Sequence, residues 1–258
     1  MTPLTLPTHT WGDASSARRA LLLHGLSSSG ATWWRVAEAL VADGYFVTAV
    51  DLRGHGTAPT ADSYAVADYA SDLPGTDWDL VIGHSLGGAT AAVASLEAGF
   101  TKRLILLDPA LVVPEADWKA VRDEQLSELT LTADDLRSSA TPWSEKDIAL
   151  KLDAVGHATA AMIEGTLDDN HPWSVIDLLP GLAVPTLILT GDPAVFTMLP
   201  PQIADAIVQA NPLVEYRVIP GAGHSPHREQ PEATLAAIHD WIPRDQAPAS
   251  AGRTTAAP

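Results

Sequence analysis

The sequence contains no cysteine. That absence excludes disulfide bonds, zinc sites built on thiolates and a cysteine nucleophile. The sequence also has no His-Glu-x-x-His pair and no calcium loop rich in Asp and Asn. A glycine-rich phosphate or dinucleotide fingerprint is missing as well. We therefore expect this chain to work without a metal and without a cofactor.

Basic residues are scarce, with 15 Lys and Arg against 32 Asp and Glu and a net charge of −17. A field of that sign repels nucleic acid and anionic membrane surfaces, so neither is an expected partner. No apolar run reaches the roughly 18 residues of a membrane helix. The first residues, MTPLTL, lack the basic and apolar regions of a signal peptide. We expect a cytoplasmic protein.

Apolar segments that read as strands alternate with segments at helical spacing. The length of 258 residues suits one α/β domain with a modest insertion. Such alternation predicts a parallel sheet with helices on both faces. The expected strands are 19–23, 45–50, 79–82, 103–107, 185–190 and 214–219, and the expected helices are 32–43, 88–96, 201–209 and 231–242.

The alternation stops between residues 114 and 180, where the sequence is acidic, dotted with Trp and helical. Its best helices are 117–129 and 145–165. Because this segment directly follows a strand end, we expect a helical cap over the carboxyl edge of the sheet. The expected organisation is a core domain of 1–113 and 181–243, the cap 114–180, and a disordered tail 244–258.

The pentapeptide Gly83-His84-Ser85-Leu86-Gly87 lies between an expected strand and a helix of small residues. This arrangement is typical of a nucleophile elbow, which exposes a serine hydroxyl on a strained turn. A Cβ at either glycine would crowd the neighbouring backbone. The helix start directs free N–H groups toward the site, where they stabilise negative charge. The pattern predicts that Ser85 forms an acyl-serine bond.

A serine nucleophile needs a base, and His224 is the best candidate. It follows the last expected strand in a glycine-rich turn, so its imidazole is free to reach across to the elbow. His227 lies near the start of the closing helix, where we expect a solvated or capping residue. His84 is adjacent to Ser85, but side chains of neighbouring residues diverge at such a turn.

Four motifs in this order resemble the α/β-hydrolase superfamily over residues 20–242: His24-Gly25-Leu26, 51–56 (DLRGHG), 83–88 (GHSLGG) and 221–224 (GAGH). The resemblance implies an α/β-hydrolase fold, with a mostly parallel central sheet flanked by helices. It also implies a helical cap inserted after the strand that ends at Asp108. In that family an oxyanion hole uses two backbone N–H groups, which correspond here to Leu26 and Leu86.

The acid of the triad is where the sequence departs from the family pattern. Family members usually carry it as Asp in Gly-x-x-Asp after the penultimate strand, but this chain has Ala194 there. Asp192 is acidic but two residues early, and Asp before Pro is a common turn former. Asp108 ends the strand after the elbow helix, where some relatives place their acid. We favour Asp108 and keep Asp192 as the alternative, since the role needs geometry and not a fixed chain order.

These residues predict a carboxylic ester hydrolase, an esterase or lactonase that works through an acyl-enzyme. The expected substrate is small to medium, largely apolar and not highly anionic, with Trp33 and Trp34 as the best candidates to line its pocket. A carbon–carbon bond hydrolase with the same triad is the first alternative. The second is a hydrolase-derived receptor that keeps the pocket and turns over negligibly.

Overall fold

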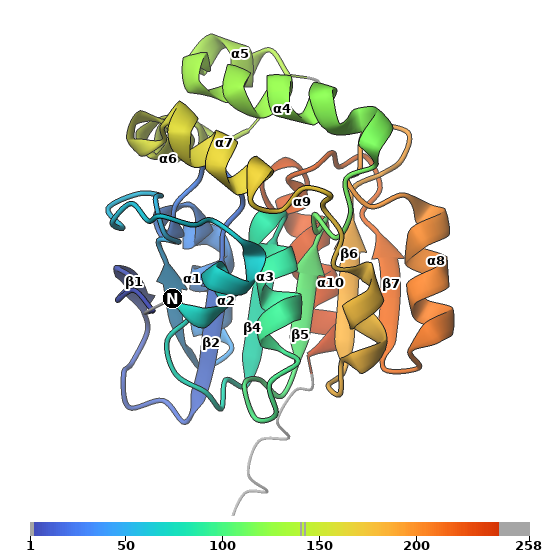
Figure 1. Ribbon diagram of the computed structural model, residues 1–258. Coiled ribbons are helices and arrows are strands. Elements are labelled where there is room, and N and C mark those ends of the chain that lie inside the picture. Colours follow the sequence, from blue (N-terminus) through green and yellow to red (C-terminus); the bar gives the residue numbers. More distant parts are fainter. Residues whose placement is uncertain (1–2, 140, 142, 243–258) are drawn as a thin grey trace, which may run out of the picture.

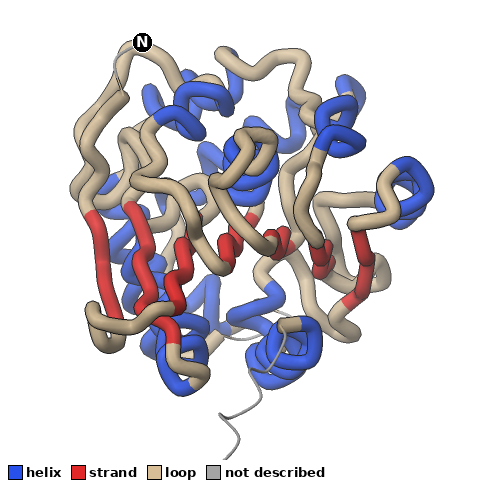
Figure 2. The backbone as a smooth tube through the Cα atoms, turned by 90° about the horizontal axis from the view of Figure 1, so that it is seen from below, coloured by secondary structure: helices blue, strands red, loops and turns tan. Residues whose placement is uncertain are grey.

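A computed structural model describes residues 3–139, 141 and 143–242 of the chain. The expected tail, 244–258, lies outside the described residues. Seven strands form one sheet in the described part, in the order β1-β3-β2-β4-β5-β6-β7 (Figure 2). β1 pairs antiparallel with β3, and every other neighbouring pair is parallel. The mostly parallel sheet of an α/β-hydrolase fold is therefore confirmed.

The strands fall close to the expected ranges, with bounds Arg18–Leu23 (β2), Tyr45–Val50 (β3), Leu80–His84 (β4), Leu104–Leu107 (β5), Thr186–Thr190 (β6) and Val214–Val218 (β7). β1, Thr8–Trp11, was not expected from the sequence. Every residue of β4 and β5 is buried. Parallel strands covered on both faces lose the alternation of polar and apolar residues, which explains their continuous apolar runs.

Helices cover the sheet on both sides (Figure 2). On one face, α1 (Trp34–Ala42) and α10 (Pro231–Trp241) pack apolar side chains against the strands. On the other face lie α2 (Val66–Ser71), α3 (Leu86–Ala94) and α8 (Pro201–Ala210). The helix expected over 32–43 begins with a 3₁₀ turn, Gly30–Trp33, and continues as α1.

The helices between β5 and β6 lie together over the carboxyl ends of the strands (Figure 1). They are α4 (Trp118–Ser127), α5 (Ala133–Arg137), α6 (Glu145–His157) and α7 (Ala160–Asp168), with 3₁₀ turns at Glu115–Asp117 and Glu128–Thr130. The last segment before β6, the 3₁₀ helix Ile176–Gly181, lies instead beside α8, where the Asn211 side chain donates to the Leu179 carbonyl (Figure 1). The single helix expected over 145–165 is wrong. The chain becomes extended at Ala158, and the Thr159 side chain then caps α7 by accepting from the Met162 N–H. No helix in the described ranges is long and apolar enough to cross a membrane.

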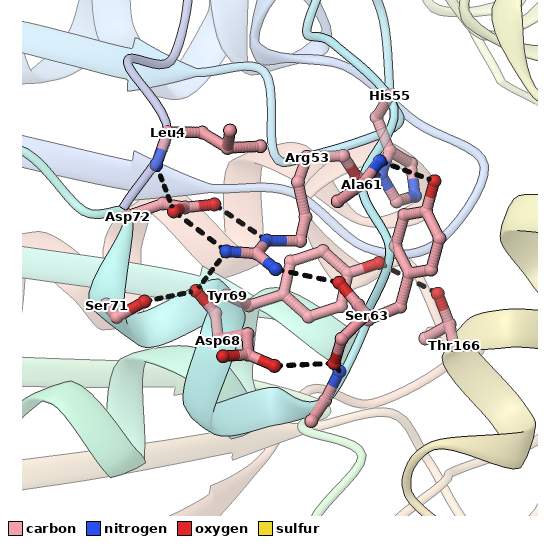
Figure 3. Close-up of polar contacts among 12 residues, drawn as sticks. Leu4, Arg53, His55, Ala61, Ser63, Asp68, Tyr69, Ser71, Asp72 and Thr166 are labelled. Atoms are coloured by element: carbon pink, nitrogen blue, oxygen red, sulfur yellow. Dashed lines mark hydrogen bonds and ion pairs between the residues drawn. The ribbon is translucent and has the colours of Figure 1, made fainter. Parts of the chain in front are cut away.

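Polar contacts hold this helical layer to the sheet domain. The Asp169 carboxylate accepts a hydrogen bond from the Tyr64 N–H, and the Asn170 side chain bonds both the Tyr64 carbonyl and the Val66 N–H. Figure 3 shows the hydroxyl of Tyr69, from α2, against that of Thr166, from α7. These contacts hold the helices α4 to α7, which we call the cap, at the end of the sheet where the expected site residues lie (Figure 1).

Candidate active site

Ser85 occupies a strained turn between β4 and α3, with φ 53° and ψ −119°. A Cβ on Gly83 would lie 2.2 Å from the Gly87 carbonyl oxygen. One on Gly87 would lie 2.3 Å from the Leu23 carbonyl oxygen. Both contacts are far shorter than any real Cβ contact, so the turn requires glycine at both positions. Left-handed backbone at a non-glycine residue persists only where the surroundings enforce it.

The surroundings of the Ser85 backbone enforce this turn. Its N–H donates to the Leu107 carbonyl at 3.1 Å, and its carbonyl accepts from the Ala110 N–H at 3.1 Å. The hydroxyl has no hydrogen bond to another described residue, and Ser85 lines a cavity. The elbow therefore presents a serine Oγ that is fixed in place and open to a substrate.

Asp108 is the carboxylate that faces the His224 imidazole. The His224 Nδ1–H donates to Asp108 Oδ2 over 2.7 Å. Asp108 is fully buried, and it also accepts from the Thr197 hydroxyl and from the Met198 N–H at 2.9 Å. Three donors to one buried carboxylate fix its orientation and, through it, that of the ring. With Nδ1 donating, His224 Nε2 is left as the acceptor nitrogen.

Asp192 forms a turn and does not bond the imidazole. Its carboxylate accepts from the N–H groups of Gly221 at 3.0 Å and Ala194 at 2.9 Å. These two bonds, the one from Gly221 first, lower the pKa of Asp192 below its ordinary value. The carboxylate braces the loop that carries His224. Of the two acids that the sequence left open, Asp108 is the one that hydrogen-bonds the His224 imidazole.

Two further histidines lie near His224, of which His84 contacts it directly. The His84 Nε2–H donates to the His224 carbonyl over 2.7 Å. The His227 ring stacks on Trp33 and meets the edge of His84, with centroid distances of 4.8 Å in both pairs. Burial holds the pKa values of His84 and His227 well below the ordinary histidine value, so both are neutral. The expectation of a solvated His227 is wrong, because it is only 4% exposed.

Two backbone N–H groups next to Ser85 are free to bind an oxyanion. The N–H groups of Leu26 and Leu86 donate no hydrogen bond within the described residues, and both residues line a cavity with Ser85. Leu86 is the first residue of α3, where helix N–H groups have no intrahelical acceptor. The Lys151 ammonium donates to the carbonyl of Ser27 at 3.0 Å, next to Leu26, and so helps to hold the loop after β2 in place.

Ser85 and His224 lie in the wall of two cavities beneath the cap. We call the first, of about 200 Å³, the polar cavity, since its wall includes Ser28, Glu124, Glu128, Lys151, Arg228 and Glu229. The second, of about 30 Å³, is the apolar cavity, lined by Leu26, Leu86, Ala110, Val113, Val121, Leu167, Trp173 and Met198. Ser85 thus lies between a charged compartment and a much smaller apolar one.

Trp33 and Trp34 do not lie where the sequence led us to expect them. Neither is among the described residues that line the polar and apolar cavities. The 3₁₀ turn before α1 directs the Trp33 ring inward, where it is 1% exposed in the core. The Trp34 indole N–H donates to Asp147 at 2.8 Å on the flank of the cap. Trp143 and Trp173 are the tryptophans that line the cavities.

Sequence reasoning missed two buried cations of the polar cavity. Lys151 lies on the buried face of α6, in the row that also contains Ile148 and Val155. A lysine on the apolar row of a helix is a signal that the sequence offered. Arg228 lies in the short helix α9, Pro226–Glu229, four residues after His224. Nothing local distinguishes it from a surface arginine.

Comparison with known proteins agrees with this architecture. The model of the alpha/beta hydrolase family matches residues 20–238, and the chain belongs to that family. N-formylmaleamate deformylase of Pseudomonas putida is 26% identical over 240 residues, which cover 86% of this chain and 87% of the relative. Esterase YbfF of Escherichia coli is also 26% identical over 240 residues, covering 86% of this chain and 92% of the relative.

A solved structure shows the same fold. The enol-lactonase from Burkholderia xenovorans LB400 superposes with a TM-score of 0.72 at 20% sequence identity. The match covers 91% of this chain and 95% of the lactonase. This likeness supports the fold, and the family match over residues 20–238 makes the chain an alpha/beta hydrolase.

Proposed function

We propose that this hydrolase cleaves a carboxylic ester or lactone through an acyl-enzyme on Ser85. The observation that carries the proposal is the position of Ser85, on a strained elbow in the wall of the cavities that His224 also lines. The buried Asp108 carboxylate on the far side of the imidazole supplies the third member of a triad. Relatives named as an esterase and a lactonase are consistent with this reaction.

The reaction follows from the roles that these groups can take. Ser85 Oγ attacks the substrate carbonyl while His224 Nε2 accepts its proton. The buried Asp108 carboxylate stabilises the imidazolium that forms, and the N–H groups of Leu26 and Leu86 bind the oxyanion. His224 then gives the proton to the leaving alcohol. Water repeats the sequence on the acyl-enzyme, which releases the carboxylic acid and restores Ser85.

A second candidate is hydrolysis of an N-formyl amide, which the deformylase relative favours. The same acyl transfer would operate, with an amine in place of the alcohol as the leaving group. Carbon–carbon cleavage with this triad and ligand binding without turnover are further alternatives. These candidates differ in the substrate that is consumed, in whether its cleavage requires Ser85, and in whether Ser85 reacts with an acylating probe.

The test is hydrolysis of p-nitrophenyl acetate and butyrate by the native protein and by Ser85→Ala. We expect the substitution to lower kcat/KM by about 10³-fold or more, because the nucleophile is removed. A fluorophosphonate probe should add its mass to the native protein and not to the variant. Thermal unfolding provides the control that both proteins are folded.

Equal rates for the two proteins would contradict the mechanism. No ester turnover, combined with cleavage of an N-formyl amide that requires Ser85, would establish the second candidate. Consumption of a coloured dienoate would indicate carbon–carbon cleavage. Thermal stabilisation by a ligand, without product and without probe labelling, would indicate a receptor.

A further inference from the structure

Arg228 is a buried cation in the wall of the polar cavity. Its side chain lies under the cap and is only 5% exposed. One guanidinium nitrogen donates to the Ser28 hydroxyl at 3.1 Å, and the Trp143 ring lies 4.8 Å from the guanidinium carbon. The Nε–H has no hydrogen-bond partner in the described ranges. One bond, to Ser28, is the only hydrogen bond that the described residues give this group of five donors, so the hydrogen-bonding capacity of the guanidinium beside the cavity is largely unused.

No carboxylate of the described residues forms an ion pair with Arg228, since the acids that share its cavity are engaged elsewhere or exposed. Glu128 accepts from the Lys151 ammonium at 2.6 Å. Glu229 accepts from the N–H of Ser225 at 2.9 Å and from that of Gly223. Glu124 is exposed on the surface of α4.

Lys151 and Arg228, the two buried cations of this cavity, therefore differ in whether a carboxylate pairs with them. Lys151 is paired with Glu128, which opposes the lowering of its pKa by burial. Burial lowers the pKa of Arg228 to about 10, which leaves the guanidinium protonated at neutral pH. A buried charge is costly unless a counter-charge reaches it. Asp147, Glu128 and Glu229 lie near enough to oppose this lowering of the pKa, but no carboxylate of the described residues hydrogen-bonds the Arg228 guanidinium. The cavity that Arg228 lines is the one that contains Ser85.

We propose that Arg228 binds a carboxylate of the substrate, so that the enzyme prefers esters or lactones with a carboxylate close to the scissile carbonyl. The planar fork of a guanidinium suits two hydrogen bonds to one carboxylate. A single unpaired cation balances a single negative charge, which favours a carboxylate over a phosphate dianion beside the three acids of this wall. The uncharged part of the substrate occupies the apolar cavity. The proposal rests on the ester hydrolysis proposed above.

The test compares pairs of substrates with one shape and different charge. Monomethyl succinate and monomethyl glutarate carry a carboxylate, and their primary-amide analogues replace it with a neutral group of the same size. We expect the native protein to favour the charged ester of a pair by about 10-fold or more in kcat/KM. Arg228→Gln should lower that preference by about 10-fold to 100-fold, mainly through KM. Arg228→Lys should restore part of it.

Arg217→Gln is the matched control, because it removes the same charge from an arginine paired with Glu215 and Asp240 at the protein surface. Its charged-to-neutral ratio should equal the native one. Equal losses on both members of a pair in Arg228→Gln would overturn the proposal and leave Arg228 with the structural role of holding Ser28. A native protein that hydrolyses both members equally would overturn it as well.

If Arg228→Gln does not fold, carboxylate binding can be tested by inhibition of the native protein. Glutarate should then inhibit hydrolysis of p-nitrophenyl acetate competitively, at concentrations at least about 10-fold lower than glutaramide. Equal inhibition by the two compounds would contradict carboxylate binding. Failure of the proposed ester mechanism is distinguishable from failure of this proposal, because hydrolysis of both the charged and the neutral esters would then be independent of Ser85.

Discussion

Asp108 and His224 are 116 positions apart in the chain, and their side chains share a 2.7 Å hydrogen bond at the carboxyl end of the sheet. β5 ends at Leu107, and the backbone of Asp108 then turns with a φ of 36°. β6 and β7 are the next strands of the sheet, and the His224 loop follows β7. The acid therefore reaches the imidazole across β6, from two strands away.

Asp108→Asn should lower kcat by about 10³-fold to 10⁴-fold, because an amide neither fixes the Nδ1–H tautomer nor stabilises an imidazolium. Asp192→Asn should lower kcat by less than about 10-fold, because Asp192 does not bond the imidazole, although the amide keeps only one of the two turn hydrogen bonds. Ester hydrolysis at saturating substrate checks both values, with thermal unfolding as the control for folding. The reverse order of the two losses would assign the triad acid to Asp192.

The elbow glycines should be far less tolerant of a methyl group than a glycine in open space. Gly87→Ala places a Cβ 2.3 Å from the Leu23 carbonyl oxygen, so we expect a loss of at least about 3 kcal/mol in the free energy of unfolding. Gly156→Ala is the control, since no atom lies within 4 Å of its added Cβ on α6. Alanine there should stabilise the protein by about 0.5 to 1 kcal/mol. Urea unfolding of the two variants measures both effects, and similar values would contradict the elbow geometry.

The Arg53–Asp72 pair should dominate the stability of the region drawn in Figure 3. Both side chains are fully buried, and two hydrogen bonds of 2.7 and 2.8 Å join them. Asp72→Ala leaves the guanidinium buried without its counter-charge, which should cost about 3 to 5 kcal/mol. Lys119→Ala breaks the exposed pair with Asp123 and should cost less than about 1 kcal/mol. Chemical unfolding compares the two, and equal losses would mean that water reaches Arg53.

Local sequence predicts the parts of this site that depend on backbone conformation. The glycines around Ser85 and before His224 specify tight turns at strand ends, and turns of this kind are readable from a few residues. The strands β2 to β7 are readable for a similar reason, since fully buried strands are continuous apolar runs. β1 was missed because Thr8–Trp11 is short and half-exposed at the sheet edge.

The parts that the sequence did not settle depend on packing between distant segments. The choice between Asp108 and Asp192 turned on which strand end points at the imidazole, and both positions carry an Asp after a strand. The residues that line the cavities under the cap were likewise not predictable from the local sequence. Trp33 faces the core while Trp143 lies against Arg228, because the path of each segment decides the direction of its ring. Net charge likewise does not report a single buried cation such as Arg228.

Acid should destabilise the protein at moderate pH through its buried histidines. The His24 Nδ1–H donates to the Gly25 carbonyl at 2.7 Å, and Nε2 accepts from the Leu52 N–H at 3.0 Å, so only the neutral ring fits. Burial lowers the pKa of His24 to about 3. For His55, burial lowers the pKa to about 4. In the unfolded chain both titrate near the ordinary value of 6.5.

The unfolded state then binds more protons than the native state below pH 6.5, so stability falls as the pH falls from 6.5 toward the folded pKa values. Each ring should cost about 2 kcal/mol of unfolding free energy at pH 5 relative to pH 7.5. His24→Asn should be less stable than the native protein at pH 7.5 but lose about 2 kcal/mol less on going to pH 5. Urea unfolding at the two pH values measures this difference, in which contributions from titrating groups distant from His24 cancel. An equal loss in the native and variant proteins would show that His24 takes up no proton on unfolding.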